Sequence, residues 1–126
     1  MFGGVPYAYA SVAAVPSDEL VFAAGACPLD PDGKVAAPGD VRAQASQAVA
    51  NLASALKAAG AGLSDVLKST IYVASADRAD LVAAWDVIRA AFGEHDAPST
   101  LLGVTVLGYP GQLVEIEAVA VAAAGS

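Results

Sequence analysis

Two helix-like stretches alternate with strand-like stretches along the chain, and this alternation constrains the fold more than any other feature. Across residues 41–59 the apolar positions recur at steps of three and four, the period that places them on one face of a helix. They are Val41, Ala45, Ala48, Leu52 and Leu56, and Gly60 ends the run. A second apolar stripe follows a helix-start signal at Asp77 and Asp80 and closes at Gly93. Its members are Leu81, Trp85, Ile88 and Phe92.

The segments around these helices are predicted to be strands and loops. Residues 67–73 are rich in β-branched and aromatic side chains, and alternation should put Leu67, Ser69, Ile71 and Val73 on one side. Two strands are expected at 101–107 and 114–121, divided by a turn at 108–111. Near the start, residues 7–15 and 20–24 are interpreted as a hairpin with its turn at 16–18. The Pro- and Gly-rich residues 28–39 are interpreted as a surface loop, and 94–99 as a short loop around Pro98.

The order β-β-α-β-α-β-β predicts an α+β fold. Each long helix connects one strand to the next, and right-handed crossovers would pack both helices on one face of a mixed sheet. The other face would be bare, and an apolar sheet face in water favours a symmetric oligomer. The 126 residues are too few for two ordinary domains, so we expect a single domain over residues 1–126.

Charge and cysteine content exclude several classes of protein. A net charge of −7 and an isoelectric point near 4.3 argue against a nucleic-acid partner, because phosphate binding depends on Lys and Arg. No apolar run reaches the roughly 18 to 20 residues that span a bilayer, and no leader pattern is visible, so we expect no membrane partner and a cytoplasmic location. Cys27 and His95, the single Cys and the single His, cannot form a disulfide framework or a four-ligand zinc site. Carboxylate metal sites remain possible.

The candidate polar residues are few. Alternation in the last strand places Glu115 and Glu117 on one face, roughly 7 Å apart, where a partly desolvated carboxylate could hold a water or transfer a proton. A solvated strand face is the alternative. His95 is interpreted as an ordinary solvated loop residue, and Cys27 as a small buried side chain, with a reactive thiol as the alternative. Motifs typical of phosphate loops, dinucleotide sites, serine hydrolases and zinc proteases do not occur.

Several segments together, in order along nearly the whole chain, resemble the Rid (reactive intermediate deaminase, YjgF-like) family. The segments are Pro6-Tyr7, residues 21–30 (VFAAGACPLD), Gly39-Asp40 leading into Gln44 and Asn51-Leu52, residues 58–60 with 65–70 (DVLKST), residues 92–95 (FGEH) and residues 114–120 (VEIEAVA).

The resemblance implies a chorismate-mutase-like fold, a homotrimer with clefts between subunits, and hydrolysis of reactive enamines or imines to a carbonyl compound and ammonia. It implies no metal and no organic cofactor, and a small-molecule substrate as the partner. By position, Glu115 matches the family's water-orienting Glu. Tyr7 matches the cleft Tyr, and Gly25 matches the strand Gly whose backbone N–H meets the substrate.

The chain departs from the family pattern where the substrate carboxylate is bound. Deaminating members carry an Arg there that grips the carboxylate, but this chain has Pro98, Ser99 and Thr100 in that segment and no Arg or Lys after Arg89. Losing that pair would weaken carboxylate binding by roughly 1.5 to 3 kcal/mol. Two further cleft positions differ from the family's usual residues: Ala24 replaces a Ser, and Trp85 lies near the place of a helix Asn.

Two functions therefore remain open. The first is a Rid-type deaminase that acts on an imine other than a standard 2-imino acid, with an apolar cleft wall made by residues 98–100 and Cys27. The second is a trimeric small-molecule-binding or interaction protein that has lost deaminase activity. A ribonuclease activity, attached to some family names, is disfavoured by the acidic charge.

Overall fold

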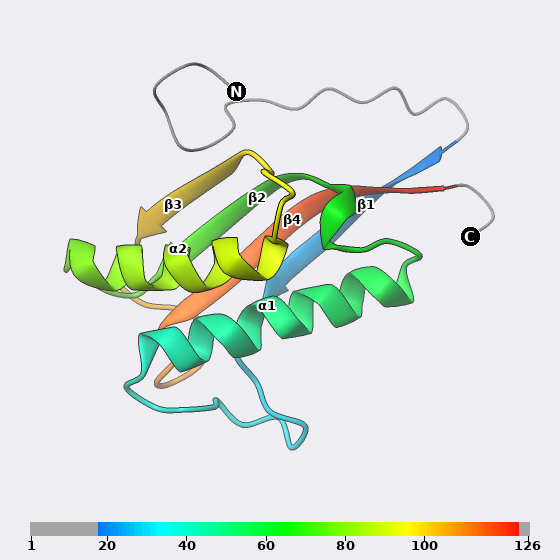
Figure 1. The fold of residues 1–126 in the computed structure, drawn as a ribbon. Helices are drawn as coiled ribbons and strands as arrows, with labels where there is room; N and C mark the ends of the chain where they lie inside the picture. Colours follow the sequence, from blue (N-terminus) through cyan, green and yellow to red (C-terminus); the bar gives the residue numbers. More distant parts are fainter. Residues whose placement is uncertain (1–17, 124–126) are drawn as a thin grey trace, which may run out of the picture.

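The computed structural model describes residues 18–123, which form one four-stranded sheet with two helices. The strands are β1 (Asp18–Ala26), β2 (Val66–Val73), β3 (Ser99–Gly103) and β4 (Val114–Ala123). Their order across the sheet is β1-β4-β2-β3 (Figure 1). β4 pairs antiparallel with both β1 and β2, while β2 and β3 are parallel, so the sheet is mixed as predicted. The strand expected at 7–15, with Tyr7, lies outside the described residues.

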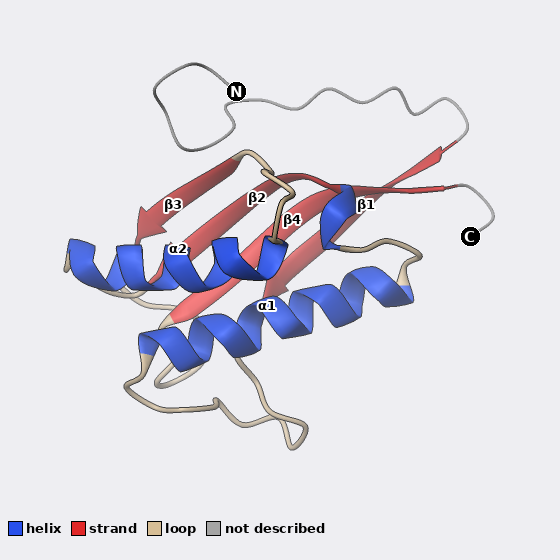
Figure 2. Ribbon diagram, viewed as in Figure 1, coloured by secondary structure: helices blue, strands red, loops and turns tan. Residues whose placement is uncertain are grey.

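Both helices cover the same face of the sheet, as the sequence predicts (Figure 2). Helix α1 (Val41–Ala58) packs on β1 and β4, and α2 (Arg78–Phe92) packs on β2 and β3. Asp40 and Asp77 start the two helices by accepting hydrogen bonds from Ala43 N at 3.0 Å and Ala79 N at 2.9 Å. A short 3-10 helix (Leu63–Asp65) links α1 to β2. Gly93 ends α2 with a φ of 66°, a conformation that favours glycine.

The apolar core lies between the helices and the sheet and uses the predicted faces. The core positions on α1 and α2 include Ala45, Ala48, Leu52, Leu56 and Ile88. Those on the sheet include Ile71, Val73, Val114, Ile116 and Ala120. Along β4 the buried positions alternate with half-buried ones, so the predicted division between the Glu115–Glu117 face and the Ile116 face is confirmed.

Two strand predictions differ from the structure in detail. β3 ends at Gly103 rather than at residue 107, because its partner β2 ends at Val73 and the last bond of this ladder joins Val104 N to Val73 O. In β2 the register shifts between Val66 and Lys68, so that Val66 is buried while Leu67 is only half-buried.

The sheet face opposite the helices carries exposed apolar side chains. Phe22 is 74% exposed on this face, Leu20 is exposed next to it on β1, and Leu102 is exposed on β3 at the other edge of the sheet. The two carboxylates of β4 and Tyr72 of β2 share the face with them. Within residues 18–123 no helix is long and apolar enough to cross a membrane.

Candidate functional site

The centre of the candidate site is the half-buried carboxylate of Glu115 at the start of β4. Its Oε1 accepts a hydrogen bond from the Cys27 thiol at 3.4 Å and one from Gln112 Nε2 at 3.2 Å. Cys27 follows β1, and Gln112 precedes β4. The residue after β1 and the turn before β4 therefore meet at one carboxylate oxygen of β4.

Gly25 lies directly against the second oxygen of this carboxylate. A β-carbon built on Gly25 would stand 2.3 Å from Glu115 Oε2, far inside van der Waals contact. The register of β1 and β4 explains this approach, because three steps from Ala23 to Ala26 match only two steps from Ala118 to Ile116. The resulting bulge turns the Gly25 backbone toward Glu115.

The environment of Cys27 keeps its thiol protonated. Burial raises the pKa of the Cys27 thiol, and the hydrogen bond and negative charge of Glu115 raise it further, while Gln112 acts weakly in the opposite sense. A raised pKa disfavours the thiolate, which is the nucleophilic form. Cys27 is thus a hydrogen-bond donor to Glu115 in this arrangement.

Polar side chains of α1 hold the loops that bring Cys27 and Gln112 to the site. Asn51 Nδ2 donates to Cys27 O at 2.8 Å and to Leu29 O at 2.9 Å, and Gln47 donates to Asn51 Oδ1 at 2.9 Å. Gln44, which is fully buried, accepts from Leu113 N at 2.7 Å. These contacts fix both loops to one helix.

Glu117 has a different partner from Glu115. Its Oε1 accepts the phenolic hydroxyl of Tyr72 at 2.6 Å. This hydrogen bond, followed by burial and by the charges of Glu117 and Glu115, raises the pKa of Tyr72 above 10.0.

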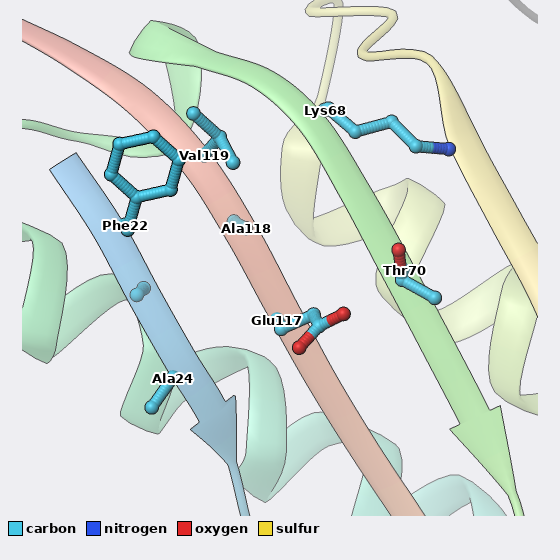
Figure 3. A pocket seen from close by; sticks show the side chains of 8 residues that line it. Phe22, Ala24, Lys68, Thr70, Glu117, Ala118 and Val119 are labelled. Atoms are coloured by element: carbon cyan, nitrogen blue, oxygen red, sulfur yellow. The ribbon is translucent and has the colours of Figure 1, made fainter. Parts of the chain in front are cut away.

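A shallow hollow of about 350 Å³ lies on the bare face of the sheet beside Glu117. Phe22 and Ala24 of β1, Glu117 and Val119 of β4, and Lys68 and Thr70 of β2 line it (Figure 3). The Lys68 side chain extends toward β3, where its Nζ donates to Thr100 Oγ1 at 2.5 Å. Ala24 therefore lies in the wall of this hollow.

In the segment 98–100, Pro98 is the last residue of the loop, and Ser99 and Thr100 begin the edge strand β3. Pro98 is buried, and its carbonyl accepts from Ser69 N at 3.0 Å. The Ser99 hydroxyl meets the buried Ser69 hydroxyl at 2.5 Å, on the helix side of the sheet. Of the three, only Thr100 is exposed, with its hydroxyl against Lys68.

Trp85 and His95 belong to other parts of the structure. Trp85 lines a separate hollow of about 390 Å³ with Ser99, Thr100 and Leu101, at the free edge of β3. His95 is half-buried rather than solvated. Its Nε2 lies 2.7 Å from Val66 O, and its ring stacks on Phe92. Within one chain, neither residue is brought to Glu115.

Sequence reasoning missed Gln112, Lys68 and Tyr72 as members of these polar clusters. Gln112 carries no spacing pattern, and its amide reaches Glu115 only because the turn before β4 folds back. Lys68 and Tyr72 gave a usable signal, since alternation in β2 places them on the face opposite Ser69 and Ile71. In the part of the chain that the structure describes, no three His, Cys, Asp or Glu residues cluster as a metal site would require.

Comparison with known proteins identifies the family. The family model described as Endoribonuclease L-PSP matches residues 6–122. A crystal structure of a Rid family protein, YyfB from Yersinia pestis, has a TM-score of 0.74 and 32% identity, covering 83% of this chain and 80% of that chain. The chain belongs to the Rid family.

Two further relatives have a similar level of sequence identity to this chain. A 2-iminobutanoate/2-iminopropanoate deaminase from Capra hircus is 35% identical to this Rid protein over 108 residues, covering 86% of this chain and 77% of that protein. A RutC family protein from Pyrococcus horikoshii is 34% identical over 107 residues, covering 85% of this chain and 82% of that protein. The mixed sheet with two helices is the Rid (YjgF-like) fold.

Proposed function

We propose that this Rid protein hydrolyses a reactive imine, or the enamine that tautomerises to it, to a carbonyl compound and ammonia. The observation that carries the proposal is the Glu115 carboxylate, which has two hydrogen bonds on one oxygen while the other oxygen lies against the Gly25 backbone. A carboxylate oxygen held in this way can accept a proton from a water and orient it toward an imine carbon.

The reaction needs no redox partner. Water forms a C–O bond to the imine carbon while its proton passes to Glu115, and the electron pair of the C=N bond moves to nitrogen. Glu115 then returns the proton to that nitrogen, which gives a carbinolamine. The hydroxyl proton of the carbinolamine passes to the nitrogen through Glu115, the C–N bond breaks, and ammonia leaves as the C=O bond forms. The backbone N–H of Gly25 serves as the donor that meets the substrate, as the family resemblance implies.

The chain differs from deaminating members in how it can bind a carboxylate. Thr100 or Pro98 stands where those members carry Arg, and neither bears a charge. Lys68 contacts Thr100, but an ammonium is a point charge that cannot make the paired hydrogen bonds of a guanidinium. We therefore propose a substrate whose imine carbon carries no carboxylate, so that standard 2-imino acids are turned over poorly.

The proposed active form is a cytoplasmic homotrimer with three clefts between subunits. The exposed apolar side chains on the face away from the helices, Phe22 above all, support burial of this face against neighbouring copies. Tyr7, which lies outside the described residues, would enter the cleft from a neighbouring subunit.

The experiment that tests the proposal is ammonia release above the spontaneous rate from imines generated in the assay. An amine oxidase supplies imines without a carboxylate, and an amino-acid oxidase supplies 2-imino acids. We expect the protein to accelerate hydrolysis of the first group, and Glu115→Gln to remove that acceleration. Glu94→Gln, which removes an equal charge from an exposed loop residue, is the matched control and should keep full activity.

Absence of acceleration with every imine would contradict the proposal. If tight binding of a metabolite were found together with that inactivity, the alternative function, a trimeric small-molecule-binding or interaction protein, would replace it. Faster turnover of 2-imino acids than of uncharged imines would overturn the assignment of substrate class alone.

A further inference from the structure

We propose that Gln112 is a positioning residue for Glu115, and that the Cys27 thiol is the second donor of the same clamp. The inference rests on the proposed function, because it assigns the group that orients the water-handling carboxylate. In this scheme both residues act on the reacting water through Glu115.

Gln112 is built into the structure as a buried and fully engaged amide. It is 3% exposed, and its Nε2 donates to Val114 O at 3.1 Å as well as to Glu115 Oε1. Its Oε1 accepts from Tyr109 N at 3.2 Å. A flipped amide would place its oxygen against two acceptor oxygens and its NH₂ against a backbone N–H, so only one orientation satisfies all partners.

The neighbours of Gln112 are held in place from α1. Gln44 Oε1 accepts from Leu113 N at 2.7 Å, and Gln44 Nε2 donates to Gly111 O at 3.0 Å. The residues on both sides of Gln112 are therefore tied to the helix. A side chain on such a support holds its partner without having to be ordered during the reaction.

The clamp leaves the two oxygens of Glu115 with different tasks. Both donors, Gln112 Nε2 at 3.2 Å and Cys27 Sγ at 3.4 Å, reach Oε1. Oε2 is the oxygen that faces Gly25. Rotation of the carboxylate would break both hydrogen bonds, so Oε2 remains directed toward the place where the family resemblance puts the substrate.

The first test is kinetic and uses an uncharged imine that the wild-type protein hydrolyses. Gln112→Met has a similar shape but no donor, and we expect kcat to fall by about tenfold to a hundredfold with KM changed less than about twofold, because a misdirected carboxylate harms the chemical step and not binding. Cys27→Ala should lower kcat as well, and Cys27→Ser, which keeps a donor, should recover most of it. An unchanged kcat in Gln112→Met, or a loss confined to KM, would overturn the proposal.

The second test measures the reactivity of Cys27 and requires no enzymatic activity from any variant. The alkylation rate of Cys27 by iodoacetamide at mildly alkaline pH reports its thiolate fraction. Glu115→Gln removes the charge that suppresses the thiolate and should speed alkylation, whereas Gln112→Met should slow it, because the hydrogen bond of Gln112 lowers the pKa of the Cys27 thiol and would be lost. If Glu115→Gln speeds alkylation and Gln112→Met has no effect, the Gln112 amide does not lie at the Cys27–Glu115 pair in solution and the clamp is disproved.

The two tests separate the possible failures. A protein that hydrolyses no imine but shows both alkylation effects would disprove the proposed function and leave the clamp geometry intact. A protein that depends on Glu115 for turnover but not on Gln112 or Cys27 would keep the function and disprove the clamp. If Gln112→Met fails to fold, the comparison of Cys27→Ala with Cys27→Ser decides whether a donor at Oε1 supports turnover.

Discussion

Tyr72 donates its phenolic hydroxyl to Glu117 across 2.6 Å, so the two carboxylates that share a face of β4 have different partners. Glu115, two residues earlier, meets Cys27 and Gln112 instead. The alternation of the strand places both carboxylates on one face, but their neighbours differ. Glu115 meets β1 and the turn before β4, whereas Glu117 meets β2. Glu117 is joined to Tyr72, while Glu115 retains an oxygen directed at Gly25.

The first prediction concerns the alkaline titration of Tyr72. Its pKa is raised above 10.0, chiefly by the hydrogen bond to Glu117, so the native protein holds the phenolic proton more tightly than the unfolded chain does. The stability from this contact is therefore fully present below about pH 10 and is lost as the pH rises through the raised pKa. In a titration followed by phenolate absorbance, Tyr72→Phe should remove a component with its midpoint above 10.

Glu117→Gln tests the cause of this shift. Loss of the carboxylate should move the Tyr72 midpoint down toward 10, whereas Glu94→Gln, at an exposed loop position, should leave it unchanged. An identical Tyr72 titration in the wild type and in Glu117→Gln would show that the Tyr72–Glu117 contact does not form in solution.

The second prediction is that Gly25→Ala inactivates the protein. A β-carbon at position 25 would lie 2.3 Å from Glu115 Oε2, so the carboxylate must move away, and a displacement of about 1 Å in a catalytic group can cost about a hundredfold in rate. We expect kcat on an uncharged imine to fall by at least about tenfold. Gly62→Ala is the control: its nearest neighbour would be Asp65 Oδ2 at 3.9 Å, so activity should be retained. Wild-type kcat in Gly25→Ala would contradict this packing.

The periodicity of apolar residues predicts those helices and strands whose regular structure follows from the local sequence. The stripe from Ala45 to Leu56 and the alternation through Glu115, Ile116 and Glu117 each repeat with the period of the element they form, so helix α1 and the two faces of β4 could be predicted directly. The end of β3 could not, because it depends on where the neighbouring strand β2 ends at Val73.

The candidate site was predictable only in part, for a related reason. Alternation in the last strand singles out Glu115, the family resemblance adds Gly25, and each stands in a strand. Gln112 reaches Glu115 through a turn whose shape depends on Gln44, a residue 68 positions away from it in the sequence. Lys68 and Thr100 meet only because β2 and β3 are parallel neighbours. Contacts of this kind follow from tertiary structure and leave no periodic trace.

The third prediction is a gain of function at position 100. Thr100→Arg would supply a guanidinium in the segment where the family resemblance places the carboxylate-binding Arg of deaminating members, and bidentate hydrogen bonds from a guanidinium to a carboxylate are worth about 1.5 to 3 kcal/mol. We expect KM for a 2-imino acid to fall by about tenfold or more, with KM for an uncharged imine unchanged. Lys68 lies against this position. If both cations face the ligand, the double variant Lys68→Met/Thr100→Arg should have a higher KM for the 2-imino acid than Thr100→Arg alone.

Thr100→Lys is the matched control for this substitution. It restores a positive charge without the paired geometry and should improve KM for the 2-imino acid less than Thr100→Arg does. Equal KM values for 2-imino acids in the wild type and in Thr100→Arg would show that position 100 does not face the substrate carboxylate.

The fourth prediction tests the proposed trimer through the most exposed apolar residue of the bare sheet face. Phe22 is 74% exposed and lies across from Val119, in the same hollow as Glu117. We expect light scattering to give the wild type a mass of about 37 kDa, that of three subunits of 12.4 kDa, because burial of this face favours association. Phe22→Glu would place a charge in the proposed interface beside Glu117 and should shift the mass toward one subunit. Val82→Glu, at a 53% exposed position on α2 on the opposite side, should remain trimeric. Dissociation by Val82→Glu but not by Phe22→Glu would assign the interface to the helices instead of the sheet.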